Sequence, residues 1–404
     1  MALGTITTID TLKWSDASDS QVAVEVRTGI IAVFFEASNV PKCATFSCTP
    51  AGVLTKIDEE TLTGIASCAI VFSAIKIADG IAAFTYINTP SPYNGFVSTV
   101  AISTAGAITA AVLDTLEFDD DTYESKIIHA TGDFWVIAFT EEGGDTPYIV
   151  TVDIDSTGAI ESAITASQQL NATGGCGGQS AVKIADGIVA LFYDSTSGGD
   201  ILYYVETRTI SAAGAISAVI DGPDEWGDVN GASNFFAFPV SGTIYACSYR
   251  EGSTLDGWVN TFNISATGTI TAVDIDTFEF ETVRVGNYPK GVAGGVTLMF
   301  FYQEYSTTYG LFKTVDIDAS GNIGAVVLDT VTVDGTYAEN TDIFKVSSTL
   351  YLALWYDNDG YGQAASLSVE SVAGLAGIIA IVDTRLHYLD KYGVERYIEG
   401  TAVS

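Results

Sequence analysis

The stretch Gly268-Thr269-Ile270-Thr271-Ala272-Val273-Asp274-Ile275-Asp276 contains the pattern that decides the fold. A pair of residues rich in Ser, Thr and Asp precedes a glycine, and an apolar residue stands two positions after that glycine. The same marker recurs at intervals of 48 to 56 residues, at Gly4, Gly52, Gly106, Gly158, Gly214, Gly268 and Gly321, and more loosely at Gly374. A nearly constant period of this size is typical of a solenoid, an array or a closed ring of repeats.

Each period holds strand-length segments in the same order. The most apolar segment lies roughly twenty residues before each marker and occurs seven times, at residues 29–35, 80–86, 134–139, 187–193, 243–249, 296–302 and 350–356. Another strand precedes it across a tight turn, a third strand runs into the marker, and a fourth leaves the marker, as in 108–118. Four antiparallel strands per period, with no helical stretch, predict a sheet-like unit repeated seven times.

The N-terminal segment completes the last repeat. Residues 4–12 resemble 268–276 and supply the missing fourth strand of the last period, which removes an exposed sheet edge. On this evidence residues 1–373 resemble the seven-bladed β-propellers, an all-β fold of four-stranded antiparallel blades. The resemblance concerns architecture, because neither the Trp-Asp dipeptide of WD40 blades nor a kelch Gly-Gly doublet recurs. Residues 374–404 lie outside the repeat.

Composition narrows the function classes. Of the 404 residues 48% are hydrophobic and 16% charged, and 50 acidic against 16 basic residues give a net charge of −34. Such a surface disfavours nucleic acid and anionic membranes, since counterion release needs basic groups. No run of 18 apolar residues is present, so membrane insertion is not expected, and the first residues lack the pattern of a secretory signal peptide.

The five cysteines carry no metal-ligand spacing. Cys43, Cys48, Cys68, Cys176 and Cys247 form no CxxC pair and are odd in number, which predicts mostly buried free thiols. Cys43 and Cys48 fall on one strand and face opposite sides, so no disulfide is expected between them.

The connections after the second and fourth strands of each unit are long and dissimilar, and all fall on one face of the predicted ring. Binding function usually lies on such variable loops. We predict a ligand- or partner-binding face built from aromatic residues among carboxylates, and these aromatic residues are Tyr93, Phe96, Tyr123, Tyr148, Trp226, Trp258, Tyr305, Tyr309, Tyr337 and Tyr361. Aromatic rings stack on sugars and anchor protein interfaces. The alternative is that many of these rings pack between blades.

No catalytic constellation stands out. His129 is expected to line the channel or the core, and the other histidine, His387, lies in the tail. The segments Asp153–Gly158 and Asp316–Gly321 imitate the start of a calcium loop but lack its Glu at position twelve, which indicates hairpin turns. Asp357 and Asp359 leave a calcium site open as an alternative to a turn. We therefore predict no cofactor, no metal and no enzymatic activity.

The C-terminal tail, residues 374–404, is expected to form an element separate from the repeats. Residues 378–389, a turn at 390–393 and residues 394–398 predict a β-hairpin. We expect it either to join other subunits of an assembly by strand addition, or to cap the last blade or plug one mouth of the channel. The residues expected in this contact are Arg385, His387, Tyr388, Lys391, Arg396 and Tyr397.

Together these features predict a non-enzymatic structural or binding protein. In general plan the chain resembles bacteriophage decoration, fibre or tail-tip proteins, which implies a place on the virion surface or outside the cell. The loop face would bind a glycan or a host-surface receptor. The alternatives are a secreted or cell-surface carbohydrate-binding adhesin and a propeller glycoside hydrolase or lyase.

Overall fold

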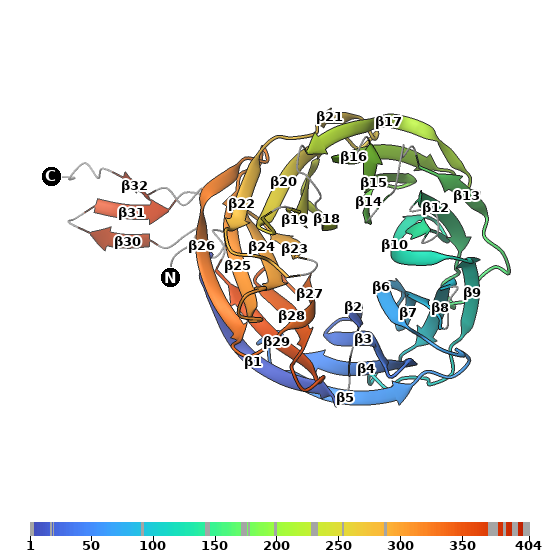
Figure 1. Ribbon diagram of the computed structural model, residues 1–404. Coiled ribbons are helices and arrows are strands. Elements are labelled where there is room, and N and C mark those ends of the chain that lie inside the picture. Colours follow the sequence, from blue (N-terminus) through green and yellow to red (C-terminus); the bar gives the residue numbers. More distant parts are fainter. Residues whose placement is uncertain are drawn as a thin grey trace.

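The computed structural model describes residues 4–370, apart from short gaps at 17, 19, 90–92, 142–145, 171–175, 177, 198–199, 228–232, 253 and 287–288, and the backbone of three further strands. Seven antiparallel sheets stand around a common axis (Figure 1). All secondary structure in the described residues is β-strand. The predicted all-β fold of seven four-stranded blades is confirmed.

Each blade is a meander whose first strand lies nearest the axis and whose fourth lies outermost. Blade 1 consists of β2 Gln21–Arg27, β3 Ile30–Ala37, β4 Val40–Cys48 and β5 Leu54–Thr61. Blade 2 consists of β6 Ile70–Ala78, β7 Ile81–Ile87, β8 Gly95–Ala101 and β9 Asp114–Asp119. Blade 3 consists of β10 Thr122–Thr131, β11 Phe134–Glu141, β12 Thr146–Asp153 and β13 Ala166–Gln169. Blades 4 and 5 consist of β14 Gln179–Ala185, β15 Ile188–Ser197, β16 Asp200–Ile210 and β17 Ile216–Gly227; and β18 Ser233–Ser241, β19 Ile244–Arg250, β20 Gly257–Ile264, β21 Ile270–Ala272 and β22 Thr277–Glu281. Blade 6 consists of β23 Lys290–Gly294, β24 Thr297–Gln303, β25 Gly310–Ile317 and β26 Ile323–Asp334.

The N-terminal strand completes the seventh blade. Blade 7 combines β27 Glu339–Lys345, β28 Leu350–Tyr356 and β29 Gly362–Val369 with β1 Ile6–Ser15 as its outermost strand. The pairing of β1 with β29 is antiparallel and runs from Ile6 opposite Val369 to Ser15 opposite Gly362. The predicted closure by residues 4–12 is therefore confirmed, and the strand extends three residues further.

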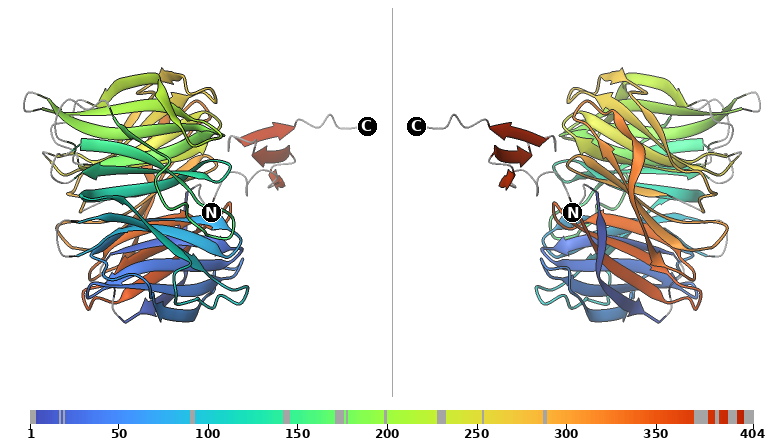
Figure 2. Two further views of the ribbon diagram at one scale, coloured as in Figure 1. Left: turned by 90° about the vertical axis from the view of Figure 1, so that its right-hand side faces the viewer. Right: turned by 90° about the vertical axis from the view of Figure 1, so that its left-hand side faces the viewer.

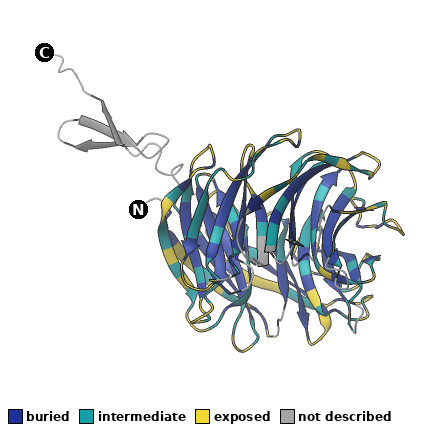
Figure 3. Ribbon diagram, turned by 45° about the horizontal axis from the view of Figure 1, so that its top comes forward, coloured by how far each residue is buried: buried dark blue, intermediate teal, exposed yellow. Residues whose placement is uncertain are grey.

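The core is divided among the blade interfaces. Seven clusters of buried apolar side chains lie one between each pair of neighbouring blades, as with Phe34 and Phe84, whose rings stack at a centroid distance of 4.5 Å between blades 1 and 2. The second strands are buried almost throughout because both of their faces meet a neighbouring blade, whereas exposed residues gather in loops and on the outer strands (Figure 3). The five cysteines are buried and unpaired, as predicted.

Each marker glycine joins two blades. All seven have φ between 75° and 93°, a left-handed conformation that residues with a Cβ rarely adopt. In every interface a hydroxyl on the third strand of the preceding blade donates to the glycine carbonyl at 2.5–2.7 Å. The donors are Thr45, Thr99, Thr151, Thr207, Thr261, Thr314 and Ser366.

A carboxylate forms a second bond in six of these interfaces. An aspartate on the outer part of one blade accepts the N–H of the apolar marker residue of the next blade at 2.7–2.9 Å. The Asp residues are Asp10, Asp58, Asp114, Asp221, Asp276 and Asp329. An Ile or Leu stands immediately before each of them and packs over the glycine. This [Ile/Leu]-Asp dipeptide recurs with the marker and was not among the expected sequence features.

The interface between blades 3 and 4 lacks the aspartate, because Ala166 occupies its position opposite Thr151, and Thr165 replaces the preceding Ile or Leu beside Gly214. We expect Ala166→Asp to raise the free energy of unfolding by about 1 kcal/mol, since its carboxylate would accept the N–H of Ile216 as in the other six interfaces. Urea unfolding of the variant measures this change. Ala166→Asn introduces a side chain of similar volume without the charge and should give a smaller gain; a loss of stability in the Asp variant would contradict the repeat geometry.

Two strand predictions need correction. The fourth strand of blade 2 does not run through 108–118, because residues between Ile108 and Asp114 bond to Thr63 in the connection between blades 1 and 2. Only β9 pairs with β8 as a regular strand. The tail contains three antiparallel strands, β30 Ile379–Val382, β31 Arg385–Leu389 and β32 Glu395–Ile398, so the expected single strand 378–389 is divided in two.

Candidate functional site

The meander topology separates two kinds of connection. The turns between first and second strands and the marker turns lie at one end of the blades, which we call the short-turn face. The connections between second and third strands and between blades lie at the opposite end, the loop face. Figure 2 shows the ring from its edge, with strands running between these two faces.

The ten predicted aromatic residues come from the loop-face half of the blades but differ in exposure. Trp226 is a correction: it is 3% exposed and packs against Phe192, Phe262 and Tyr249 in the core between blades 4 and 5. Its ring therefore stabilises the interface and is not available to a ligand.

Three further rings are half-buried by packing within the blades. Phe96 stacks on Tyr86 at a centroid distance of 5.4 Å, and Tyr148 stacks on Phe139 at 5.7 Å. Trp258 packs against the core between blades 4 and 5. For these residues the alternative that aromatic rings fill the space between strands describes the structure better than surface recognition does.

Three tyrosines are exposed, and the ring does not bring all of them together. Tyr123 is 46% exposed on blade 3, whereas Tyr305 at 55% and Tyr309 at 38% share one loop of blade 6. That loop is tied to its neighbours, because Tyr305 N–H donates to Arg284 O at 2.7 Å and Ala338 N–H donates to Thr308 O at 2.8 Å. We call residues 304–309 and 335–338 the tyrosine rim.

Carboxylates and further rings border the tyrosine rim. Tyr337 donates to Glu339, which also accepts a 2.5 Å bond from the hydroxyl of Tyr356. Next along the loop face, Lys13 Nζ lies 3.1 Å from the centroid of the Tyr361 ring. Tyr93 lies away from the rim, between β7 and β8 of blade 2; it is half-buried, and its carbonyl accepts the N–H of Thr122 at 2.8 Å. The rim is therefore an aromatic surface with hydrogen-bond acceptors beside it.

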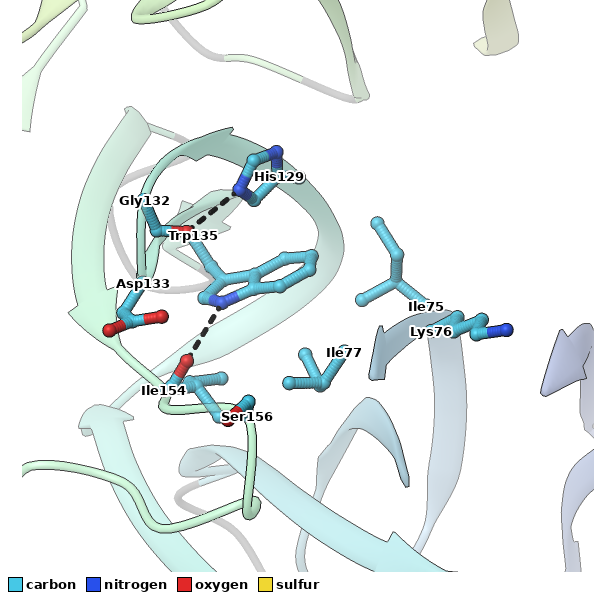
Figure 4. Close-up of a pocket in the computed structure, with 9 residues that line it drawn as sticks. All are labelled: Ile75, Lys76, Ile77, His129, Gly132, Asp133, Trp135, Ile154 and Ser156. Atoms are coloured by element: carbon cyan, nitrogen blue, oxygen red, sulfur yellow. Dashed lines mark hydrogen bonds between the residues drawn. The ribbon is translucent and has the colours of Figure 1, made fainter. Parts of the chain in front are cut away.

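A pocket of about 330 Å³ opens on the short-turn face, which the sequence analysis did not expect to carry a site (Figure 4). Its floor is Trp135, whose Nε1 donates to Ile154 O at 3.2 Å. His129 lies at its edge, with Nε2 3.0 Å from Gly132 O and Nδ1 2.8 Å from Lys183 Nζ. Since both ring nitrogens are engaged, His129 is not poised as a free general base.

The innermost strands carry a group of charges around the axis. Lys126 Nζ of β10 and Lys290 Nζ of β23 lie 4.4 and 4.6 Å from the centroid of the Phe236 ring on β18. Burial, with a contribution from the Lys290 ammonium, lowers the pKa of Lys126 to about 8, while Asp342 opposes this shift. These residues were not among the predicted site residues; the signal in the sequence was a lysine within an otherwise apolar inner strand.

This pKa shift has a testable consequence for stability. The pKa of Lys126 falls from 10.5 to about 8 on folding, so its positive charge lowers the free energy of unfolding. This destabilisation is complete below about pH 8 and decreases to zero between about pH 8 and 10.5. We expect Lys126→Met to raise the free energy of unfolding by about 1 kcal/mol at pH 7, after allowance for solvent screening and a lost cation–π contact, and by less at pH 9.5. Denaturant unfolding at both pH values measures this, with exposed Lys345→Met as the control; a gain that grows with pH would contradict it.

Other buried charges form closed hydrogen-bonded groups. Arg208 Nε donates to Glu206 Oε1 at 2.6 Å, and Tyr193 donates to Glu206 Oε2 at 3.0 Å. Burial raises the pKa of Glu281, but bonds from Tyr302 and Lys313 outweigh it and hold the pKa below its usual value. Such groups are satisfied within the protein and leave no atom for a substrate.

Among the described residues no group of three or more His, Cys, Asp or Glu side chains is placed to hold a metal ion. Asp357 Oδ1 accepts the N–H groups of Asp359 and Tyr361 at 3.0 Å, and its Oδ2 accepts Gln363, which is the geometry of a turn. In the part of the chain that the structure describes, no helix has the length and apolar character to cross a membrane. The tail side chains and Lys391 lie outside the described residues.

The fold and the blade interfaces define a seven-bladed β-propeller. No protein-family model matches the chain, and no curated protein is similar to it in sequence. Among solved structures it is similar to a hypothetical selenium-binding protein from Sulfolobus tokodaii, with a TM-score of 0.53, 9% identity and coverage of 88% of this chain and 90% of that one. It is also similar to the polysaccharide lyase Uly1, with a TM-score of 0.51, 6% identity and coverage of 87% and 90%. At these identities the likeness concerns the fold.

Proposed function

We propose that this protein is a non-enzymatic binding component of a larger assembly, displayed on a virion surface, whose loop face binds a glycan or a host-surface protein. The observation that carries the proposal is the tyrosine rim, where Tyr305 and Tyr309 are the exposed rings of one hydrogen-bonded loop. Tyrosine offers a flat apolar face and a polar tip, which suits both a sugar ring and a protein partner. Glu304 at the start of the same loop accepts the hydroxyl groups of Ser306 and Thr307, and its carboxylate oxygens have further lone pairs for hydroxyl groups of a ligand.

The tail supplies the second half of the proposal. In the sheet β30-β31-β32 the outer strands β30 and β32 each pair with β31 and with no other strand that the structure describes, so each presents one edge that strand addition from another subunit can use. The residues proposed for this contact include Arg385, His387 and Tyr388 on β31 and Arg396 and Tyr397 on β32. Removal of residues 374–404 should therefore leave the propeller folded and abolish its incorporation into particles.

Glycan binding is tested on the tyrosine rim. We expect Tyr305→Ala with Tyr309→Ala to weaken binding on a glycan array at least tenfold, because each stacked ring contributes roughly 0.5–1.5 kcal/mol beyond its buried area. Tyr123→Ala, an equally exposed ring three blades away, is the matched control and should retain binding. Equal binding by the double variant would contradict the proposal for this rim. Turnover of a polysaccharide by the intact chain would favour a hydrolase or lyase, and binding without incorporation into particles would favour a cell-surface adhesin.

A further inference from the structure

Two lysines from distant blades converge near the axis. Lys126 belongs to blade 3, and Phe236 and Lys290 belong to blades 5 and 6, so the contact of Lys126 with Phe236 passes over the intervening blade 4. Both ammonium nitrogens contact the ring of Phe236, at 4.4 and 4.6 Å from its centroid, so they lie within about 9 Å of each other. All three side chains are half-buried, so solvent reaches them.

Neither ammonium forms an ion pair with a carboxylate of the described residues, in a chain that has 50 acidic side chains. Six other lysines do form ion pairs: Lys13, Lys42, Lys56, Lys76, Lys183 and Lys313. Asp342 influences Lys126 but is committed to the backbone, since its carboxylate accepts the N–H groups of Ala23 and Ile343 at 3.0 Å. Two cations held close together with no counter-ion among the described residues call for an anion from outside the chain.

A buried amide adds a third donor on the strand next to Lys126. Gln179 begins β14, is 8% exposed, and neither its Nε2 nor its Oε1 has a hydrogen-bond partner among the described residues. Side chains alternate along a strand, so Lys126 shares a side of β10 with Ile128, and Gln179 shares a side of β14 with Ala181. Ile128 and Ala181 belong to one core cluster between blades 3 and 4, and Lys126 and Gln179 therefore lie on facing sides of neighbouring strands.

We propose that Lys126, Lys290 and Gln179 bind one oxyanion group, a carboxylate or a phosphate, of a small ligand that enters along the axis of the ring. The two ammonium groups would neutralise the anion, the Gln179 amide would donate a hydrogen bond that it otherwise lacks, and the Phe236 ring would support the apolar part of the ligand. Charge-assisted bonds in a half-buried setting are stronger than surface ion pairs. The site is separate from the tyrosine rim and does not depend on it.

Isothermal titration calorimetry of the intact chain tests the site with three sugars that differ in charge: glucuronate, glucose 6-phosphate and uncharged glucose. At pH 7 and low salt we expect saturable binding of at least one acidic sugar and none of glucose, and the acid that binds identifies carboxylate or phosphate as the preferred group. Lys290→Met should weaken binding at least tenfold, whereas Lys345→Met, the same change of charge at an exposed position, should leave it unchanged. Absence of binding by both acids, or equal binding by Lys290→Met, would overturn the proposal.

A second variant keeps the test independent of lost stability. Gln179→Glu places a carboxylate of the chain itself beside Lys126, so it should abolish binding of the acidic sugars and raise the melting temperature by several degrees. Gln168→Glu, at an exposed position, controls for the added charge and should do neither. A melting temperature that falls in Gln179→Glu, together with unchanged sugar binding, would show that Gln179 does not face the lysines. Because no residue of the tyrosine rim is altered, a negative result here leaves the proposed function untouched.

Discussion

Gly268→Ala is expected to lower the free energy of unfolding by about 2–4 kcal/mol, a large share of the stability of an ordinary domain. The alanine would have to keep the φ of 85° that Gly268 has, and this left-handed conformation costs a residue with a Cβ about 1–2 kcal/mol. The Cβ of the alanine would also lie 2.8 Å from Ile220 Cδ1 and 3.2 Å from Ile188 Cγ2, and overpacking of this kind costs about 1–3 kcal/mol. Movement of the chain away from this contact would lengthen the bond from Thr207 to the Gly268 carbonyl.

Gly132→Ala separates the two effects. Gly132 also has a positive φ, 54°, but no atom lies within 4 Å of the position that a Cβ would take. This variant should lose only about 1–2 kcal/mol, the conformational part of the cost. Chemical denaturation of both variants measures the difference. If both variants lost the same free energy of unfolding, the marker glycines would be required only for the conformation of the turn, and the close approach between blades would contribute nothing.

Deletion of residues 1–15 is expected to destroy the ring or reduce the free energy of unfolding by more than 5 kcal/mol. The deletion removes β1, and with it the bonds from Thr314 to Gly4 O, from Ile6 N–H to Asp329 and from Leu54 N–H to Asp10. It would also leave β29 as an open edge, which favours association between copies of the chain.

Trp14 is the apolar anchor of the same strand. Its ring is 0% exposed, meets Phe35 edge-on at a centroid distance of 4.9 Å and packs against Gly362. Trp14→Ala alone should cost about 3–5 kcal/mol. A synthetic peptide of residues 4–15 should restore a cooperative thermal transition to the shortened chain, and the same peptide with Trp14→Ala should restore it poorly. A deletion variant that unfolds at the original temperature would show that closure contributes little.

The marker glycines explain how much of the architecture could be predicted. A tight turn with φ near 80° depends on residues adjacent in sequence, so its period was visible, and the seven copies defined seven blades. The similarity of residues 4–12 to 268–276 placed the N-terminal strand for the same reason. Fourth strands were less predictable, because residues 110–112 pair with Thr63 of the previous connection, a partner about fifty residues earlier.

The aromatic residues show where prediction from sequence ended. Trp226 lies on the outer strand β17 and is 3% exposed in the core, whereas Tyr305 lies in the loop between β24 and β25 and is 55% exposed. The end of a strand and the side of it that faces the neighbouring blade decide this difference, and spacing along the chain did not reveal either.

By itself the sequence determined the all-β class, the count of blades, the closing strand and the acidic surface of this protein. These features depend on local turns, strand periodicity and composition, which are properties of contiguous residues. Only the tertiary structure decided that Asp58 of one blade bonds to Ile108 of the next, and that Lys126 and Lys290 meet on Phe236. Those contacts depend on the rotation between successive blades around the axis, because that rotation alone brings side chains of distant repeats within bonding distance.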